Sequence, residues 1–162
     1  MSLSLSLTNK IERKIRKATV FQYITSNKSE QVIEALRQIS VRSGMTIYIW
    51  YSKLGLVNIK SKQMPLPGTR SVLEALKYAS KNHYFAVYVF PAVNNADLME
   101  IKGTLPSANT NLKVNEHTRH LFIFNEDVFF PYLRTNGEQI ELSNEHTKKY
   151  KLRDSKWVLS DE

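Results

Sequence analysis

The sequence predicts a three-layer α/β fold, in which a mainly parallel sheet of about five strands lies between helices on both faces. Short runs of β-branched and aromatic residues alternate with segments of helical periodicity, and this alternation is typical of βαβ units with right-handed crossovers. The run at 84–90 is apolar throughout, as expected of a strand covered on both faces. No period of roughly 20–50 residues repeats along the chain, which excludes solenoid and array folds.

The composition of the 162 residues bounds the class of protein. Hydrophobic residues make up 42% of the chain, which is typical of one globular domain with its own core. There is no cysteine, so disulfides, thiolate metal sites and a cysteine nucleophile are excluded. No apolar run approaches the roughly 20 residues that cross a bilayer, and the leader MSLSLSL is too short for a signal peptide. We therefore expect a cytoplasmic protein.

The formal net charge of +8 is the outlying feature, and its surplus lies at the two ends of the chain. At the N-terminal end, Ile11 and Ile15 stand at helical spacing among cations. Residues 8–17 are therefore predicted to form a short basic amphipathic helix or a partly ordered segment, within an arm at 1–17. We expect this arm to lie outside the core of the domain at 18–143, so that its removal leaves the melting transition nearly unchanged.

The sequence pattern in the first half of the domain predicts two strands with a helix between them. Residues 18–24 form a strand, and Ser26 or Asn27 is a suitable N-cap for the helix that follows. The apolar stripe of this helix ends before Gly44, which supplies a left-handed stop. Next come a strand at 46–51, a short hairpin arm at 56–59 and a break at 65–68.

The second half continues the same alternation. Thr69 or Ser71 begins a helix that ends near 80–83, and the strand at 84–90 is predicted to lie at the centre of the sheet. The remaining predicted elements are a short helix at 95–105, a polar loop at 106–115, a strand at 120–124 and a fifth strand at 139–142.

A parallel sheet raises the question of nucleotide binding, and the sequence argues against it. A phosphate loop needs glycines between the first strand and the first helix, so that backbone amides approach the anion closely. The corresponding stretch, 25–30, has no glycine, and neither GxxxxGK[ST] nor GxGxxG occurs in the chain. No apolar strand ends in the acidic residue that would hold magnesium. No cofactor and no small-molecule substrate are expected.

Two groups of polar residues are weighed as metal-binding or catalytic. His117 and His120, with Glu116, have the outline of a metal site, but strand alternation turns residues three apart to opposite faces. The stretch Asn-Glu-Asp at 125–127 contains the most site-like carboxylates, although such carboxylates more often cap helices or face solvent. A nuclease or hydrolase built on these residues is a third hypothesis, and no catalytic or metal-binding residue is assigned.

The two ends of the chain are the candidate contact segments. The basic tail at 144–162 carries an apolar strip, and its residues 151–159 alternate like an edge strand that either folds back on the domain or docks on a partner. The predicted partner-binding residues are Arg13, Lys14, Arg16, Lys17, Tyr150, Arg153 and Trp157. A possible second surface, at the end of the second strand, consists of Trp50, Tyr51 and Leu54.

The layout around the second and third strands resembles the degenerate ATPase-like N-terminal domain that precedes the active module in a group of bacterial and plastid AAA-type ATPases. The matching segments are Tyr23-Ile24-Thr25, Glu30 to Leu36, Ile47 to Trp50, Gly55-Leu56, Pro67, Ser71 to Leu76, and Ala86 to Val89. The resemblance spans roughly residues 18–142. It implies a degenerate P-loop-like or Rossmann-like topology in which Trp50 and Gly55-Leu56 keep a structural turn. The sequence stops where the active module would begin, so no catalytic residue is carried over.

These observations favour a non-catalytic subunit or adaptor of a larger assembly, which contacts protein partners through its basic and apolar termini. The alternative is a nucleic-acid-binding accessory protein that uses the same cations, with an affinity that falls steeply with salt.

Overall fold

The computed structural model describes residues 3–17, 21–61, 64–91, 93–94, 96–97, 99, 117–124, 137–142, 150–153 and 156–159. The helices in this part of the chain are α1 (Leu5–Ile15), α2 (Ser29–Ser43) and α3 (Val72–Lys81). The strands are β1 (Gln22–Thr25), β2 (Ile47–Tyr51), β3 (Gly55–Asn58), β4 (Ala86–Phe90), β5 (Thr118–Phe124), β6 (Glu138–Gln139), β7 (Tyr150–Arg153) and β8 (Lys156–Leu159). None of the described helices is long and apolar enough to cross a membrane.

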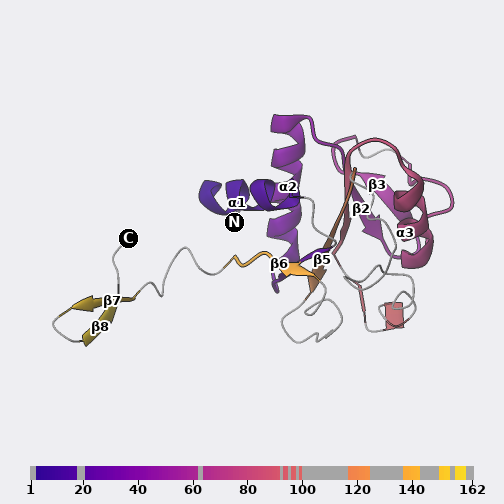
Figure 1. The fold of residues 1–162 in the computed structure, drawn as a ribbon. Helices are drawn as coiled ribbons and strands as arrows, with labels where there is room; N and C mark the ends of the chain where they lie inside the picture. Colours follow the sequence, from indigo (N-terminus) through magenta and orange to yellow (C-terminus); the bar gives the residue numbers. More distant parts are fainter. Residues whose placement is uncertain are drawn as a thin grey trace.

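Six strands form the main sheet, in the order β3-β2-β4-β5-β1-β6. Figure 1 shows α2 on one side of this sheet and α3 on the other. All neighbouring pairs are parallel except β2 and β3, which form an antiparallel hairpin. If the five parallel strands β1, β2, β4, β5 and β6 are renumbered 1 to 5 in chain order, their order across the sheet is 2-3-4-1-5. This order differs from the classic Rossmann and flavodoxin orders, so it favours the ATPase-like alternative of the predicted topology.

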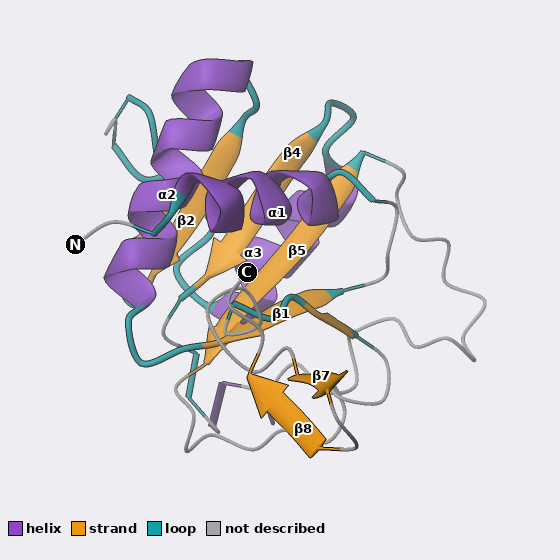
Figure 2. Ribbon diagram, turned by 90° about the vertical axis from the view of Figure 1, so that its left-hand side faces the viewer, coloured by secondary structure: helices purple, strands orange, loops and turns teal. Residues whose placement is uncertain are grey.

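The three-layer α/β prediction is confirmed. Figure 2 shows α1 and α2 on one face of the sheet and α3 on the other. Strand β4 is buried at every position and lies between β2 and β5, as predicted for the apolar run at 84–90. The left-handed stop at Gly44 (φ 76°) and the N-cap at Ser71 are also as expected.

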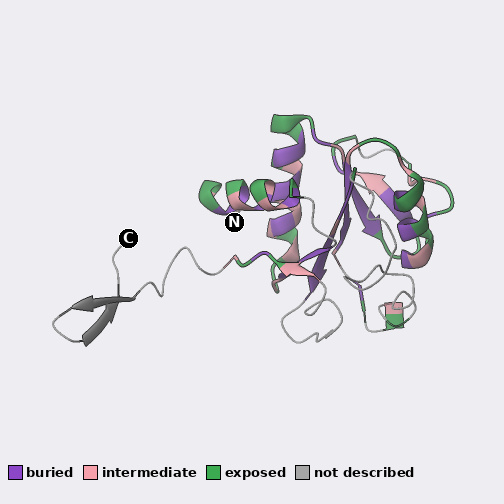
Figure 3. Ribbon diagram, viewed as in Figure 1, coloured by how far each residue is buried: buried purple, intermediate pink, exposed green. Residues whose placement is uncertain are grey.

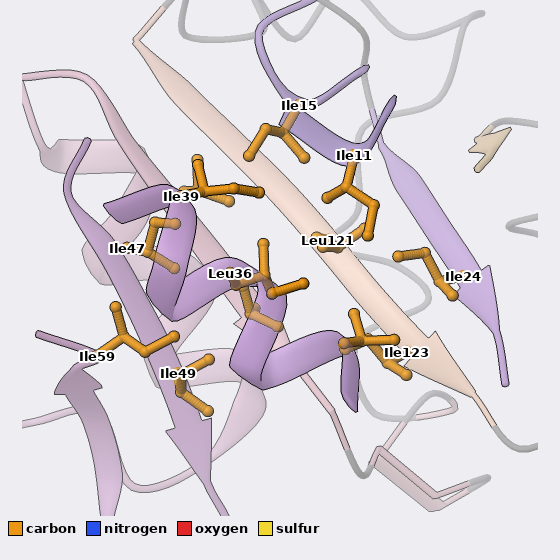
Figure 4. Close-up of a cluster of buried hydrophobic side chains, with 14 of the residues drawn as sticks. Ile11, Ile15, Ile24, Leu36, Ile39, Ile47, Ile49, Ile59, Leu121 and Ile123 are labelled. Atoms are coloured by element: carbon orange, nitrogen blue, oxygen red, sulfur yellow. The ribbon is translucent and has the colours of Figure 1, made fainter. Parts of the chain in front are cut away.

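The two faces of the sheet carry different side chains. Toward α3 the strands present mainly aromatic residues, such as Phe90 and Phe122, whose rings stack with centroids 5.0 Å apart. Toward α1 and α2 they present aliphatic residues, and Figure 4 shows these gathered around Leu36 of α2. Because side chains alternate along a strand, each strand contributes to both cores.

Helix α1 is part of the domain, so the prediction of an arm outside the core is wrong. Leu7, Ile11 and Ile15 are buried, and the two isoleucines belong to the aliphatic core with Ile24 and Ile123 (Figures 3 and 4). Helical spacing places these residues on one stripe, and the stripe is covered by α2 and the sheet. Ser4 caps the helix by accepting a hydrogen bond from the Leu7 amide at 3.2 Å.

The C-terminal segment forms a hairpin of its own rather than a single edge strand. Strands β7 and β8 pair antiparallel as a two-stranded sheet, and neither pairs with the six-stranded sheet. The predicted helix at 95–105, the polar loop at 106–115 and the stretch at 125–127 lie wholly or mostly outside the described residues.

Candidate functional site

The turn between β1 and α2 occupies the place where a phosphate loop would lie. The amide of Ser26 donates to the carbonyl of Phe124 at 2.8 Å, which ties the turn to the end of β5. The amide of Lys28 donates to the hydroxyl of Ser26 at 3.0 Å. Glu30 lies in the first turn of α2, where the helix dipole would otherwise favour a bound anion. Two amides of the turn are therefore used internally, and a carboxylate lies beside it.

Trp50, which was predicted on a strand-end surface with Tyr51 and Leu54, is mostly buried, although it helps to line a groove at the ends of β2 and β4. Its side chain is only 3% exposed, and its indole donates to the carbonyl of Arg70 at 3.2 Å. Tyr51 and Leu54, by contrast, are 40% and 58% exposed. Strand alternation explains the difference between the two neighbours, because the side chain of Tyr51 points to the opposite face of the sheet from that of Trp50.

Gly55 and Leu56 hold the segment that leads into α3. The amide of Leu56 donates to the Thr69 hydroxyl at 2.9 Å, and the Leu56 carbonyl accepts from the Leu66 amide at 2.8 Å. Gly55 has a φ of 116°, and a Cβ atom at this position would lie 2.6 Å from the Thr69 hydroxyl oxygen. Trp50, Gly55 and Leu56 thus hold the segment at 66–70 against the edge strand β3. This segment leads to Ser71, the N-cap of α3.

A groove of about 510 Å³ lies at the carboxyl edge of the sheet, between one face of α2 and the ends of β2 and β4. In parallel sheets this edge is where ligands usually bind. We define this edge groove by its lining residues, which include acidic Glu30 and Glu34, apolar Ile33, Trp50, Tyr51 and Pro91, and basic Arg37. Glu34 is paired with Arg37, whereas Glu30 forms no ion pair within the described part of the chain. The groove therefore has an apolar wall and a free carboxylate.

A second hollow, of about 470 Å³, lies between the start of α1, the β1–α2 turn and β6. Hydroxyl and amide groups of Thr25, Ser26, Gln31 and Gln139 line it together with apolar residues such as Leu7. It adjoins the position of the missing phosphate loop. Its charged lining residues are Lys28 and Glu141, which are of opposite sign.

The four predicted contact cations of the N-terminal segment lie in the second half of α1 and just after it. Lys14 is half-buried and forms an ion pair with Glu138 at 3.4 Å. Arg16 is exposed and forms one with Glu12, one turn earlier, at 3.7 Å. Arg13 and Lys17 are exposed and form no ion pair among the described residues. Three of the four predicted residues are therefore open to solvent.

The β7–β8 hairpin contains the predicted contact residues of the C-terminal segment. Its register pairs Tyr150 with Leu159, Lys151 with Val158, Leu152 with Trp157 and Arg153 with Lys156. All three predicted residues, Tyr150, Arg153 and Trp157, therefore lie in one two-stranded sheet.

His120 is half-buried among aromatic rings. Its ring centroid lies 5.4 Å from that of Phe21 and 6.3 Å from that of Tyr88. Its Nδ1 atom is buried without a hydrogen-bond partner in the described structure. Burial, and secondarily the charge of Arg119, lower the pKa of His120 to about 4. The described residues contain no group of three or more metal-ligating side chains, while Glu116 lies outside them.

A tyrosine group lies at the opposite, amino edge of the sheet. The hydroxyls of Tyr48 and Tyr84 are 2.7 Å apart, and Asn82 donates to the Tyr88 hydroxyl at 2.6 Å. Burial raises the pKa of Tyr48 and of Tyr88, so both remain neutral hydrogen-bonding groups at physiological pH. This arrangement fastens the end of α3 to the sheet.

Comparison with known proteins gave one match. A family model described as "SpoVK-like AAA ATPase, N-terminal domain" matches residues 7–131. The match begins within α1, which agrees with the burial of that helix and extends the resemblance beyond the segment that starts at residue 18. Neither the curated proteins nor the solved structures contain a match.

Proposed function

The chain belongs to the family of SpoVK-like AAA ATPase N-terminal domains, and we propose that it is a non-catalytic protein-binding domain that serves as a subunit or adaptor of a larger assembly. Its layered sheet is consistent with an ATPase-like fold, and its sequence contains neither GxxxxGK[ST] nor GxGxxG. The proposed role of the domain is to hold contact surfaces in a fixed geometry. No catalytic residue, metal or cofactor is assigned to it.

The observation that carries the proposal is the β1–α2 turn. A phosphate cradle requires free backbone amides at a helix N-terminus and close approach of the anion. In this turn the Ser26 amide is bonded to Phe124, and Glu30 adds a negative charge to the helix N-terminus. Binding a nucleotide triphosphate here would cost the internal hydrogen bonds and meet electrostatic repulsion.

The proposed contact segments are the exposed cations in and just after α1 and the β7–β8 hairpin. Arg13 and Lys17 are exposed and form no ion pair among the described residues. The sequence of the hairpin contains one tryptophan and one tyrosine, residue types that often dominate binding energy at protein interfaces.

Nucleic-acid binding is the second candidate function, and the exposed Arg13 and Lys17 favour it. Single-stranded binding combines cations with aromatic side chains on one surface. The sequence of the C-terminal segment contains both residue types, since Tyr150 and Trp157 stand among cations.

The test is native purification of the full chain from its own cells, with and without nuclease and at low and moderate salt. A protein that stays bound after nuclease and moderate salt supports the adaptor function. An R13Q/K17Q variant serves as the control for the cations. Partners that vanish with nuclease, and that also vanish in this variant, would replace the proposal with nucleic-acid binding.

A further inference from the structure

The edge groove lies where an open parallel sheet usually binds its ligand, at the carboxyl ends of the strands. Its volume of about 510 Å³ is within the range of binding sites, roughly 300–1,000 Å³. The start of α2 contributes Ser29 and Glu30 to its lining, next to the turn in which the amides of Ser26 and Lys28 are used internally. The groove therefore offers side chains to a ligand, in place of the backbone amides of a phosphate loop.

One wall of the edge groove is apolar, and it adjoins the exposed turn between β2 and β3. Ile33 and Pro91 are half-buried, while Tyr51 is 40% exposed. Leu54 is 58% exposed, and its amide donates to the Tyr51 carbonyl at 3.0 Å, so the two residues belong to one tight turn. Exposed apolar side chains that gather at one place are typical of a surface that contacts another protein.

The groove is acidic within a basic chain. Glu34 is paired with Arg37, whereas Glu30 is exposed and forms no ion pair among the described residues. The lining therefore carries one carboxylate that a ligand can neutralise, although the net charge of the chain is +8. A cation is attracted to this carboxylate, and a phosphate or an acidic side chain is repelled by it.

We infer that the edge groove binds an extended segment of a partner protein in which an arginine or lysine stands next to an apolar residue. The cation pairs with Glu30, and the apolar side chain packs on Ile33, Tyr51 and Pro91. The inference rests on the proposed function, because it states the chemistry of a segment that the protein partner presents. A nucleic acid does not fit this groove, since its phosphates would meet the carboxylate of Glu30.

Arginine suits the groove better than lysine. Its planar guanidinium can pair with a carboxylate through two parallel hydrogen bonds, and it can stack on an aromatic ring. The lining of the groove supplies both partners, the carboxylate of Glu30 and the partly exposed ring of Tyr51. We therefore expect an arginine-containing segment to bind more tightly than its lysine counterpart.

The experiment titrates the 15N-labelled full-length chain with short peptides, capped at both ends, and follows the backbone amide signals by NMR. The probe is the peptide GLRLG. Its matched controls are GLELG, which carries an acid in place of the cation, and GSRSG, which lacks the apolar side chains. We expect GLRLG to shift the signals of residues 29–37 and 50–54 in a saturable way, and both controls to bind at least about fivefold more weakly.

Charge variants at position 30 give the decisive comparison. E30Q removes the charge and is expected to weaken binding of GLRLG by about two- to fivefold, as for an exposed ion pair. E30R places like charges together, so it should lose GLRLG and bind GLELG more tightly than the unaltered chain does. The matched control is E74Q, in the first turn of α3, which should leave binding within about twofold. Unshifted signals outside the groove establish that each variant is folded.

Three results would overturn the inference. In the first, GLRLG gives no saturable shifts at millimolar concentration. In the second, GLELG binds the unaltered chain as tightly as GLRLG does, and in the third, E30R leaves both affinities unchanged. The proposed function is tested separately, because a nuclease-resistant protein that copurifies with the chain supports it even if all three results are obtained.

Discussion

The two basic ends of the chain look alike in sequence and differ in structure. At the N-terminal end, α1 buries an aliphatic stripe, and its Lys14 and Arg16 form ion pairs within the domain. At the C-terminal end, β7 and β8 form a two-stranded sheet, and neither strand pairs with the six-stranded sheet. Charge alone does not distinguish an interface from a structural layer. The spacing of the apolar residues among the charges does, because a helical stripe packs on a neighbouring layer.

Shortening the chain at either end should expose this difference most strongly. Removal of residues 1–17 takes away Leu7, Ile11 and Ile15, and loss of one buried isoleucine to alanine typically costs about 2–5 kcal/mol. We expect the domain without α1 to be largely unfolded, and I15A to be destabilised by about 2–4 kcal/mol in urea denaturation. An unchanged urea midpoint for I15A would show that α1 does not contribute to the stability of the core.

The acid sensitivity of the domain should come from its core and not from its termini. The pKa of His120 is lowered in the folded state, so protons bind the unfolded state preferentially. Stability is then fully present above pH about 6.5 and falls as the pH drops toward about 4, by about 1–3 kcal/mol. Urea denaturation at several pH values checks this, and H120F should flatten the profile in that window. If H120F leaves the pH dependence of the free energy of unfolding unchanged, the loss of stability in acid comes from other titratable groups.

The ion pairs of α1 should matter far less than its apolar stripe. Arg42 contacts Glu12 at 2.8 Å and Asn9 at 3.3 Å, so it joins α2 to α1. Exposed pairs of this kind contribute about 0–1 kcal/mol and are screened by salt. We expect R42A and K14A each to lower the free energy of unfolding by less than about 1 kcal/mol, and less again at high salt. Losses comparable to that of I15A would contradict this ranking.

Removal of the C-terminal tail should have the smallest effect on stability. Deletion of residues 144–162 takes away a sheet that does not pair with the domain, so the free energy of unfolding should change by no more than about 0.5 kcal/mol. The same deletion should weaken binding of the proposed protein partner. A large loss of stability would show that the tail packs on its own domain.

Much of the fold follows from local signals in the sequence. The apolar run at 84–90 predicts the central position of β4, Gly44 predicts the end of α2, and Ser71 predicts the start of α3. The role of α1 was missed because Ile11 and Ile15 are surrounded by cations. Their spacing was visible, but whether a stripe packs on the sheet depends on tertiary contacts that no local pattern records.

The candidate surfaces were predicted less well than the fold. Tyr51 and Leu54 were correctly placed at the surface, while Trp50 proved to be buried. The edge groove was missed because its residues come from α2, β2 and the segment after β4, which only the sheet brings together. The hairpin was missed because the alternation in 151–159 shows a strand but not the reversal within it.

The central proposal is that this ATPase-like domain does not bind nucleotide, and calorimetric titration of the full chain with ATP and magnesium tests it most directly. We predict no heat of binding above that of dilution, because the amides of Ser26 and Lys28 in the β1–α2 turn are used internally and Glu30 lies beside them. Saturable binding that is lost on a substitution in this turn, such as K28A, would contradict the account and restore the edge of the sheet as a nucleotide site.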